Sequence, residues 1–526
     1  MSEVRERTME ELELGVFDVL VLGGGIVGGR VAFDAARAGL RVALVDAGDF
    51  GGATSGASAR LVHGGLRYLR TGNVRLVRTA LRERNVLASR IAPHLVRPLP
   101  FVLSAAEGQR SKCAAGLIAY AALNGFGRPL PRFITPEEAV RLVPSLRVDG
   151  LTSHAVFQEA ETNDSRLALA TVAAAVRSGA VAANYLRAVA LELAPGKNSR
   201  VLLQGREGTL IVRCRAVVNA TGPWVDLVRK MEDPGCGPVA RLSKGIHVVL
   251  RPAEKWRAAV AVSMDGGRHL YAVPCEDMIL LGTTDEEYIG DPAGVAAEPA
   301  DVVSLLEMAQ HFLRPEMLDG ERMVSAFAGL RVLSRGEVAS RRASRDHLLS
   351  VGPGGMVSVA GGKLTTHRQI ALDAMRRLPS HVRPSRLSLS DAPLPGASPI
   401  CRRELYSRLD RSTVDHLLHH YGAESARLLE YSKVHHDALE QITPGAPDLW
   451  AQVHHAISEE WAVTAEDIIY RRTTLGPRGL DTPEIRQRIS RLLEAEIPTP
   501  QSTSPPASAH TFHVSPRRSN SPQVRR

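Results

Sequence analysis

The alternation of apolar and polar stretches at the start of the chain predicts a strand, a helix and a second strand. Residues 19–22 are apolar throughout, residues 27–38 carry apolar positions at helical spacing, and residues 42–45 form a second short apolar run. A glycine cluster separates the first two segments, and Gly39 ends the helical one. This order indicates a β-α-β unit, with which a doubly wound α/β sheet begins.

The rest of the pattern divides the chain into a strand-rich middle and a helical end. Helices are expected at residues 74–92, 166–178 and 364–378, and strands at residues 185–193, 200–204, 209–219, 245–250 and 269–283. A Pro-Leu-Pro-Gly sequence at 393–396 precedes a region, 400–495, that is helical almost throughout. From Pro498 onward, prolines, serines and arginines without any acidic residue predict a disordered basic tail.

Composition and charge narrow the class of protein. With 526 residues, 44% hydrophobic and 23% charged, the chain has the composition of an ordinary globular protein of several domains. Its net charge of +9 favours an anionic partner such as a phosphate, a nucleic acid or an acidic membrane face. Aromatic residues make up only 4%, which argues against a stacking surface for nucleic acid, so no nucleic acid partner is expected.

Cysteines and targeting signals exclude further classes. The five cysteines are scattered without any C-x-x-C pair, which excludes a disulfide framework and a zinc ribbon and fits a reducing cytosol. No cluster of cysteines or carboxylates suggests a metal, so none is expected. The N-terminus lacks the apolar core of a secretory signal. The longest uncharged stretch, residues 113–127, is too short and too polar to span a bilayer, although it could lie buried or rest on an interface.

Two glycine motifs point to a dinucleotide. Gly23, Gly25 and Gly28 form a G-x-G-x-x-G sequence after a strand and at the start of a helix, where amide groups can face a diphosphate. Asp46 ends the next strand, where a carboxylate accepts hydrogen bonds from ribose hydroxyls and disfavours a 2′-phosphate. An apolar strand ending in Ala-Thr-Gly at Gly222 is typical of two-dinucleotide flavoproteins, so FAD is favoured over NAD.

A longer series of motifs resembles one family. The sequence S-A-R-L-V-H-G-G-L-R-Y-L at residues 58–69 resembles the S-S-K-L-I-H-G-G-L-R-Y-L signature of FAD-dependent glycerol-3-phosphate dehydrogenases. Further matches follow in order over about residues 16 to 490, at 82–84, 92–95, 219–224, 282–285, 328–331, 344–346, 361–366, 460–461 and 467–472. The chain departs from the family pattern at Ala59, Arg60, Ile246, Cys275, Val332 and His367.

The resemblance implies an α/β flavoprotein of the D-amino-acid-oxidase-like type, with a doubly wound FAD-binding domain, an antiparallel substrate domain and an all-helical C-terminal cap domain. The expected boundaries are 16–95, 150–230 and 330–385 for the FAD-binding domain, 96–149 and 231–329 for the substrate domain, 391–495 for the cap, and 1–15 and 496–526 for disordered tails.

The resemblance also implies a reaction and its site. Glycerol 3-phosphate would be oxidised to dihydroxyacetone phosphate by hydride transfer to flavin N5, with electrons passed to a membrane quinone. The enzyme would be cytoplasmic and bound peripherally to the inner face of the cell membrane. The cofactor contacts carried over are Gly23, Gly25, Gly28, Asp46, Thr54, Ser55, Ser58, Gly64, Gly65, Gly222, Gly362, Lys363, Leu364 and Thr365. The substrate contacts carried over are Arg67, Tyr68, Arg331, Arg345 and Lys363.

The chemistry of these residue types fits that reaction. Planar arginine guanidinium groups suit bidentate contacts with a phosphate. Lys363 follows two glycines in a chain with only seven lysines, which favours a specific role for its ammonium group. His63 and His247 both remain candidates for the base that accepts the hydroxyl proton, because imidazole titrates near neutrality. The expected catalytic set is therefore His63, His247, Arg331 and Lys363.

Other assignments stay open at this stage. Glycerol-3-phosphate oxidases are closely related but carry an insertion for which this length leaves little room. An amine or amino-acid oxidase would need one arginine for a carboxylate and no cationic cluster. A non-enzymatic flavin-binding scaffold that docks on nucleic acid through the basic tail is a third alternative. The sequence also leaves open whether the chain forms a homodimer.

Overall fold

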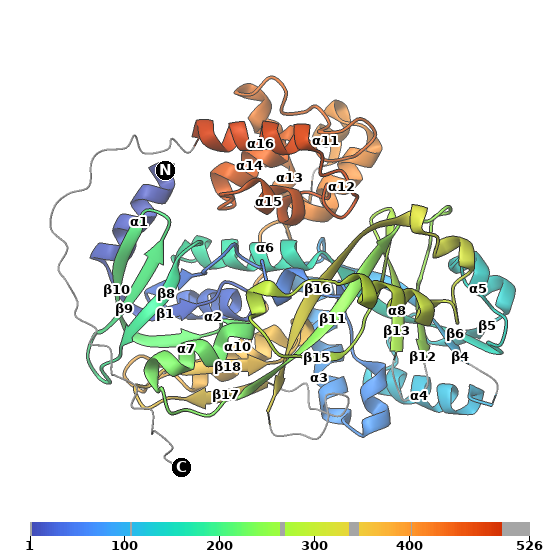
Figure 1. Ribbon diagram of the computed structural model, residues 1–526, viewed down its shortest axis with the longest axis horizontal. Coiled ribbons are helices and arrows are strands. Elements are labelled where there is room, and N and C mark those ends of the chain that lie inside the picture. The colour runs from blue at the N-terminus through green and yellow to red at the C-terminus, as the bar shows by residue number, and fades with distance from the viewer. Residues whose placement is uncertain (1–2, 106–107, 264–268, 336–346, 401, 497–526) are drawn as a thin grey trace, which may run out of the picture.

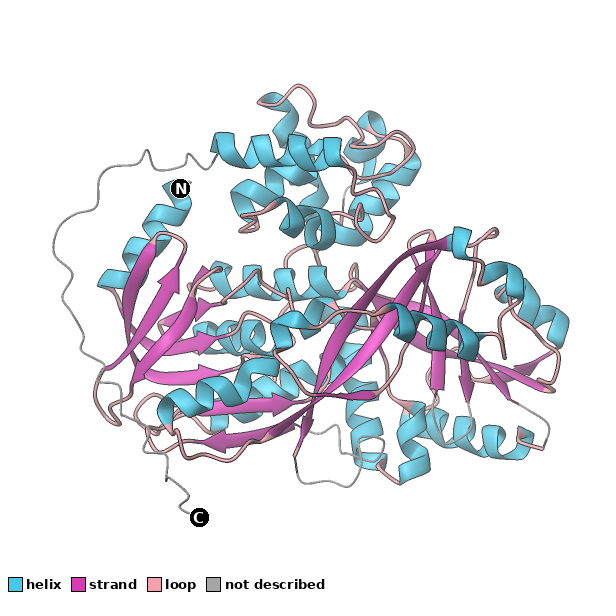
Figure 2. Cartoon of the chain, in the orientation of Figure 1, coloured by secondary structure: helices cyan, strands magenta, loops and turns pink. Residues whose placement is uncertain are grey.

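The computed structural model describes residues 3–105, 108–263, 269–335, 347–400 and 402–496. Two β-sheets lie side by side, and a group of helices from the end of the chain sits above them (Figure 1, Figure 2). Within these described ranges, no helix combines the length and the apolar character needed to cross a bilayer.

The first sheet is the doubly wound one. Its strands are β1 (Val16–Leu22), β2 (Val42–Val45), β7 (Val181–Ala183), β8 (Arg187–Glu192), β9 (Ser199–Gly205), β10 (Gly208–Asn219), β17 (His347–Val351) and β18 (Val357–Gly361). The central order is β17-β18-β10-β1-β2-β7, and the five strands from β18 to β7 run parallel. Apart from Asp18, β1 and β2 are apolar, and they are almost entirely buried, as is typical of parallel strands with both faces covered.

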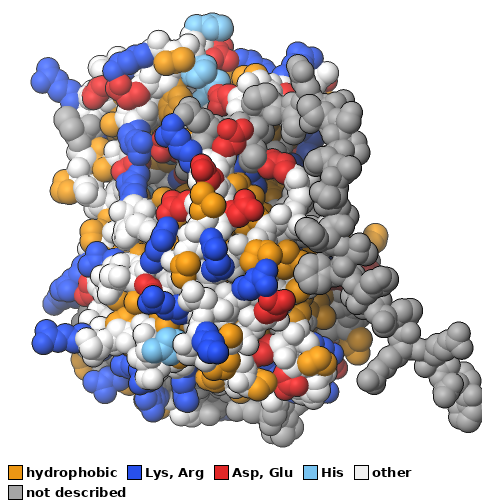
Figure 3. Space-filling view, turned by 90° about the vertical axis from the view of Figure 1, so that its left-hand side faces the viewer, with side chains coloured by type: hydrophobic (Ala, Val, Ile, Leu, Met, Phe, Trp, Pro, Cys, Tyr) orange, Lys and Arg blue, Asp and Glu red, His pale blue; other side chains and the backbone are white. Residues whose placement is uncertain are grey.

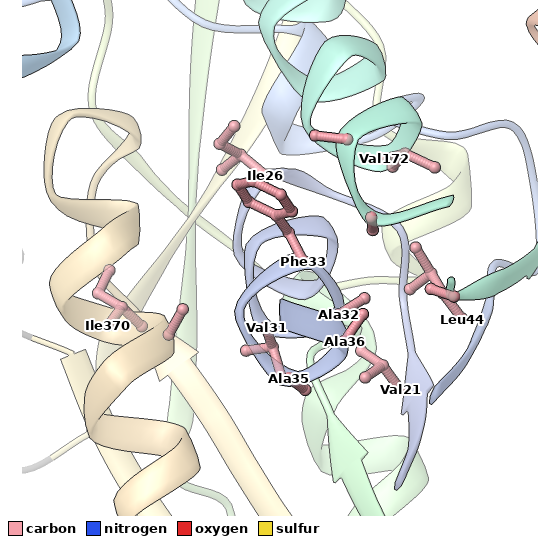
Figure 4. Close-up of a cluster of buried hydrophobic side chains, with 14 of the residues drawn as sticks. Val21, Ile26, Val31, Ala32, Phe33, Ala35, Ala36, Leu44, Val172 and Ile370 are labelled. Carbon is pink, nitrogen blue, oxygen red and sulfur yellow. The ribbon is translucent and has the colours of Figure 1, made fainter. Parts of the chain in front are cut away.

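Helices α2 (Ile26–Arg37), α6 (Asp164–Arg177) and α10 (His367–Arg376) pack together on one face of this sheet. Val31, Phe33 and Ala35 of α2 are buried against β1, α6 and α10, where Val172 and Ile370 join the same cluster (Figure 4). Small residues on α2 allow this close packing, since Gly29 abuts Val172. The core therefore fixes the start of α2, which follows the glycine turn. Helices α1 (Glu3–Leu14) and α7 (Val225–Glu232) also contact this sheet, whereas α3 (Val74–Val86) packs in a hydrophobic cluster with strands of the second sheet.

The second sheet is mostly antiparallel. Its strands are β3 (Leu61–Val62), β4 (Val96–Ala105), β5 (Arg132–Ile134), β6 (Ser153–Thr162), β11 (Ala240–Leu250), β12 (Ala259–Ser263), β13 (His269–Cys275), β14 (Met278–Gly282), β15 (Glu286–Tyr288) and β16 (Met323–Ser334). Helices α4 (Arg110–Leu123), α5 (Pro136–Leu142) and α8 (Pro299–Ala309) accompany it. The long pair β11 and β16 runs toward the first sheet, and β16 contacts β18, so the two sheets meet there.

The last described part of the chain is helical. Its helices are α11 (Arg402–Arg408), α12 (Arg411–Tyr421), α13 (Ser425–Glu430), α14 (Trp450–Glu459), α15 (Ala465–Asp467) and α16 (Pro483–Glu496). Buried ion pairs attach this group to the first sheet: Arg166 on α6 donates to Glu460 over 2.7 Å, and Arg472 pairs with Asp49. The expected fold class, a doubly wound flavoprotein with an antiparallel second sheet and a helical C-terminal domain, is confirmed.

The structure differs from the sequence expectations at two places. The described part of the expected N-terminal tail is not disordered, because Glu3–Leu14 form helix α1, whose Leu12 is fully buried and whose Arg5 donates to Asn184. The expected strand over residues 269–283 is a hairpin, because Glu276 adopts a positive φ and reverses the chain between β13 and β14. The expected domain boundaries stay a prediction. Strand β6 falls within the range 150–230 expected for the FAD-binding domain, and it pairs with β4 in the second sheet. The expected tail at 497–526 lies outside the described residues.

Surface charge on the side formed by the first sheet is mixed. Lysine and arginine side chains there alternate with aspartate and glutamate and do not gather into one basic patch (Figure 3). The positive net charge therefore says little about a docking surface on this side of the molecule.

Candidate active site

The glycine turn after β1 has the shape of a diphosphate cradle. Gly23 has a positive φ of 101°, which only glycine adopts without strain. A Cβ atom at Gly28 would overlap the carbonyl oxygen of Gly23, so this residue must lack a side chain for α2 to follow the turn so closely. The amide of Ile26, at the start of α2, donates to the Ser55 hydroxyl over 3.0 Å. The free amides of this helix end and the nearby hydroxyl fit a phosphate group.

Asp46 lies beside the turn at the end of β2. Its two carboxylate oxygens accept hydrogen bonds from the amides of Gly24 (2.6 Å) and Gly48 (2.9 Å), which fix the carboxylate in place. Burial raises the pKa of Asp46 to about 6, although both amide hydrogen bonds act in the opposite direction. The carboxylate keeps lone pairs for further donors, as the predicted contact with ribose hydroxyls requires.

The signature segment at residues 58–69 runs between the two sheets and is held by contacts from both. The Ser58 amide donates to Asp164 on α6 (2.9 Å), and the His63 amide donates to the Thr365 hydroxyl (3.2 Å). Gly65 has a positive φ of 77° and starts a short 3-10 helix, Leu66–Thr71. These contacts bring the segment beside the Gly361–Thr366 motif, as the resemblance implies.

Cationic side chains gather where this segment meets the second sheet. The Lys363 ammonium lies 3.6 Å from the centre of the Tyr68 ring, and Arg67 donates to the Tyr68 hydroxyl over 2.9 Å. Arg331 on β16 donates to the Thr283 hydroxyl over 2.5 Å and lies 3.5 Å from Asp285. The charge of Asp285 also acts on Arg67, so these two arginines belong to one group.

His247 lies in the same region on β11. Opposite residues on neighbouring antiparallel strands face the same side, and His247 lies opposite Phe327 on β16, on which its ring stacks with centroids 5.1 Å apart. Four residues further along the same two strands, Arg331 lies opposite Ser243. Burial, together with the charges of Arg331 and Arg60, lowers the pKa of His247 to about 3. Neither ring nitrogen hydrogen-bonds to another described residue, so a neutral imidazole is available to a ligand.

The remaining expected positions fall around the same space. Thr54 donates to the carbonyl oxygen of Leu330, and a Cβ at Gly64 would overlap the Tyr120 hydroxyl. Gly222 and Gly362 both have a positive φ and turn the chain at the ends of β10 and β18. Leu364 begins a short 3-10 helix, so Lys363 precedes a helical turn as expected. Arg345 lies outside the described residues.

Two departures from the family pattern contact each other. The Arg60 guanidinium lies 2.6 Å from the Cys275 thiol, so the longer arginine occupies space that a small residue at 275 leaves. Burial raises the pKa of the Cys275 thiol to about 11, so the thiol is neutral and accepts the arginine N–H. The two changes are therefore coupled, which single positions in a sequence do not reveal.

Sequence reasoning missed a buried network behind Gly64. Glu159 on β6 accepts the Gly64 amide over 3.1 Å and the Arg84 guanidinium over 2.8 Å, and Tyr120 donates to the same carboxylate. Glu159 sits on an alternating strand, so no local signal marks it. Arg84 lies in the Arg-Glu-Arg sequence at 82–84, and Thr283 lies in the Gly-Thr-Thr-Asp sequence at 282–285, so the family resemblance marks both positions without giving their contacts.

A cavity of about 470 Å³ opens next to this site. Its lining includes His63 and Arg67 on one side and Phe101, Phe157 and Tyr271 of the second sheet, and it extends to α4 at Cys113. A largely apolar cavity with a few polar groups is typical of a small-molecule site.

Comparisons with known proteins agree with this arrangement. Residues 18–368 match the family described as FAD dependent oxidoreductase, and residues 388–497 match the C-terminal domain of alpha-glycerophosphate oxidase. A glycerol-3-phosphate dehydrogenase of Mycobacterium leprae is 33% identical over 472 residues, covering 87% of this chain and 80% of that protein. The chain belongs to the FAD-dependent glycerol-3-phosphate dehydrogenase family.

Another member of the glycerol-3-phosphate dehydrogenase family, from Pseudomonas aeruginosa, is 33% identical over 92% of this chain and 96% of its own length. The FAD complex of the glycerol-3-phosphate dehydrogenase from Bacillus halodurans has a TM-score of 0.73 at 25% identity, covering 94% of this chain and 96% of that one. An L-alpha-glycerophosphate oxidase from Mycoplasma pneumoniae shares the fold, with a TM-score of 0.58 at 15% identity over 73% of this chain and 100% of that one. FAD is the cofactor of this family, and the glycine turn and Asp46 fit it.

The raised pKa of Asp46 predicts a pH dependence of FAD binding. Ribose hydroxyls donate to the carboxylate more strongly than to the neutral acid, so FAD binding favours the charged form. We expect the dissociation constant of FAD to rise as the pH falls through about 6. Titration of the apoprotein followed by flavin fluorescence at several pH values measures this. Asp46→Asn should bind FAD weakly at every pH, and equal pH dependence in both proteins would contradict the assignment.

Proposed function

We propose that this protein oxidises sn-glycerol 3-phosphate to dihydroxyacetone phosphate and passes the electrons to a membrane quinone. The observation that carries the proposal is the cationic group of Arg67, Arg331 and Lys363 beside the buried His247. The names of the relatives, glycerol-3-phosphate dehydrogenases, support the same substrate. A carboxylate substrate would need one arginine, so the group favours a phosphate over the amino acid of an oxidase.

The cofactor contacts belong to this proposal. FAD, held by the turn at Gly23, Gly25 and Gly28 and by Asp46, supplies the acceptor for a hydride from C2 of the substrate. The other contacts proposed are Thr54, Ser55, Ser58, Gly64, Gly65, Gly222, Gly362, Lys363, Leu364 and Thr365. Their positive φ angles and hydroxyl groups support close approach of a planar ligand to the backbone.

Arg331 and Arg67 are proposed to bind the phosphate, with Lys363 and Tyr68 beside them. The Arg331 guanidinium donates to the Thr283 hydroxyl and lies 3.5 Å from Asp285, and these contacts orient a planar group whose geometry suits a phosphate. Arg345 is proposed as a further phosphate ligand from the family motif alone. Phosphate binding would neutralise the cations that surround His247.

His247 is the preferred candidate for the proton acceptor, with His63 as the alternative. Its imidazole is neutral, and the positive charge of Arg331 helps to hold its pKa low. A phosphate dianion on Arg331 would offset that charge and raise the proton affinity of the ring. The base would therefore strengthen when substrate is bound. The backbone amide of His63 donates to the Thr365 hydroxyl, a contact that positions the residue without using its imidazole ring.

Anaerobic mixing tests the reaction. With glycerol 3-phosphate, we expect the absorbance of the oxidised flavin to bleach within the turnover time, while glycerol and D-amino acids leave it unchanged. A flavin that stays oxidised with glycerol 3-phosphate would refute the substrate assignment. After reduction, an anaerobic quinone should reoxidise the flavin much faster than air-saturated buffer does, and the reverse order would indicate an oxidase.

The quinone and membrane part of the proposal rests on α4. The residues Ala115, Ile118, Ala119 and Ala122 recur at helical spacing and are all exposed, and Phe126 and Leu130 follow them at 58% and 49% exposure. Arg110, Lys112 and Arg128 are exposed around this apolar stripe. An apolar face flanked by basic residues suits the interface of an anionic membrane. We propose that this stripe places the protein on the inner face of the cell membrane.

The cavity described above supports a path from that stripe to the site. It reaches α4 at Lys112, Cys113 and Gly116 and the catalytic region at His63 and Arg67. A quinone ring leaving the bilayer at α4 would thus enter an apolar space that borders the site. This placement would account for the exposed apolar residues in the uncharged stretch at 113–127.

Vesicle binding tests the role of α4. The double variant Ile118→Asp and Phe126→Asp should lose co-sedimentation with vesicles that contain anionic lipid, because two charges replace the apolar contacts. Flavin reduction by glycerol 3-phosphate should stay unchanged, and reduction of quinone in the vesicles should fall at least tenfold. Val303→Asp on α8, another exposed apolar position, is the matched control. Equal sedimentation of both proteins would contradict the proposal.

A further inference from the structure

Three possible metal ligands meet inside the C-terminal helices, away from the site described above. They are His435, which follows the short 3-10 helix Tyr431–Lys433, His454 on α14, and Glu496 at the end of α16. One ligand atom from each lies within 4.8 Å of the other two. The three elements are separated in sequence, so tertiary packing alone brings them together.

His454 is the central member of this group. Its side chain is 2% exposed, and neither of its ring nitrogens makes a hydrogen bond with a described residue. Nδ1 faces Glu496 Oε1 at 3.6 Å, and Nε2 faces Asp437 Oδ1 at 3.7 Å, both too long for a good hydrogen bond. A buried polar group without a partner is costly and needs an explanation.

We propose that His435, His454 and Glu496 bind a zinc ion. Two imidazoles and one carboxylate form a known ligand set for zinc, with a fourth position left to water. Asp437 lies on the far side of the His454 ring and accepts the guanidinium of Arg488, so it is held where it can orient that ring. Zinc-bound histidines regularly have such a carboxylate behind them.

The geometry requires a small closure of the ligands. Tetrahedral zinc with ligands at about 2.0–2.1 Å needs its ligand atoms about 3.3 Å apart, so the group must close by about 1 Å or more. The His435 ring now stacks on the His454 ring with centroids 3.7 Å apart and must turn from that position. His435 and Glu496 are both partly exposed, and Glu496 ends its helix, so both side chains have room to move.

Local charge favours a cation here more than at the other histidine group. Asp437 and Glu496 carry two negative charges against the single positive charge of Arg488. In contrast, Glu276 near His419 and His420 already accepts His420 at 2.9 Å and faces Arg478 at 3.9 Å. Glu276 therefore already has a hydrogen-bond partner and a guanidinium beside it, whereas no guanidinium among the described residues pairs with Glu496.

The spacing explains why no metal was expected from the sequence. His435, His454 and Glu496 form no compact motif, and none of them is a cysteine. The ion would join α14 to the last turn of α16. None of the three residues belongs to the proposed flavin or phosphate contacts, so the ion would take no part in the oxidation of glycerol 3-phosphate.

Zinc binding by the holoenzyme tests the proposal. After dialysis against buffered zinc and removal of free metal, we expect one zinc per chain by elemental analysis, and X-ray absorption should report nitrogen and oxygen ligands only. His435→Gln and Glu496→Gln should each lose this zinc and the accompanying rise in unfolding temperature. His436→Gln, an exposed neighbour, is the matched control and should keep both.

Three outcomes would overturn the proposal. One is an absence of stoichiometric zinc, as expected if His454 only packs between Asp437 and Glu496. Another is full zinc binding by both His435→Gln and Glu496→Gln. The third is zinc lost only in His420→Gln, which would move the site to the Glu276 group. Flavin reduction by glycerol 3-phosphate should be the same in His435→Gln, Glu496→Gln and the wild type, so these results do not depend on the proposed reaction.

Discussion

Replacing Arg331 with methionine should lower the second-order rate constant of flavin reduction by glycerol 3-phosphate by about 10² to 10³. The guanidinium is proposed to bind the substrate phosphate, and loss of a partly buried charged partner costs about 3–4 kcal/mol. Arg331→Lys should recover only part of the loss, because an ammonium group cannot make two parallel contacts. Anaerobic stopped-flow measurements at several substrate concentrations would give the constant.

The control for this prediction is Arg335→Met. Arg335 lies four residues further along the chain and is exposed, so its removal should leave the rate constant within about twofold. Both variants should keep their FAD. The preference for glycerol 3-phosphate over glycerol should fall in Arg331→Met alone. An unchanged preference would show that Arg331 does not bind the phosphate.

The second large effect is expected at Arg472, which joins the C-terminal helices to the first sheet. Arg472 is fully buried and donates to both oxygens of Asp49 and to the carbonyl of Glu460. Arg472→Met leaves part of the Asp49 charge uncompensated in a buried place. We expect the free energy of unfolding to fall by about 3–5 kcal/mol in urea titrations.

A matched pair lies at the same junction. Arg177 on α6 pairs with Glu424 of the C-terminal helices, but its side chain is 47% exposed. Arg177→Met should therefore cost less than about 1 kcal/mol. If both substitutions lower the free energy of unfolding equally, burial is not the reason for the large contribution of the Asp49–Arg472 pair. The double variant Asp49→Asn and Arg472→Met should lower the free energy of unfolding by less than the sum of the effects of the two single variants.

Local patterns predicted the parts of the fold that are contiguous in sequence. The β-α-β start consists of neighbouring segments, so the spacing of its apolar residues and the glycines of its turn are enough to predict it. Helix α1 escaped prediction because its surface is highly charged and its anchoring depends on Leu12 and on Arg5, whose partner Asn184 is distant in sequence. The hairpin at Glu276 was missed because its two turn residues, Glu276 and Asp277, include neither glycine nor asparagine, the residues that usually mark such a turn.

The candidate site was harder to assemble than the fold. Arg67, His247, Arg331 and Lys363 come from four separate elements, and no period or spacing brings them together. The family resemblance predicted that most of these residues belong to the site, and the structure shows which groups they contact. Pairs such as Arg60 with Cys275 appear only in three dimensions, because each is an unexplained departure when considered alone.

The position of Asp49 has a consequence for how cofactor loading and domain docking affect each other. Asp49 lies three residues after Asp46 on one loop, so the side chains that anchor the C-terminal helices and the side chain proposed to hold the ribose share a single short segment. Thermodynamic linkage then makes the effects reciprocal. FAD should protect the connection around residues 393–396 from proteolysis, and a chain cut there should release its FAD more readily.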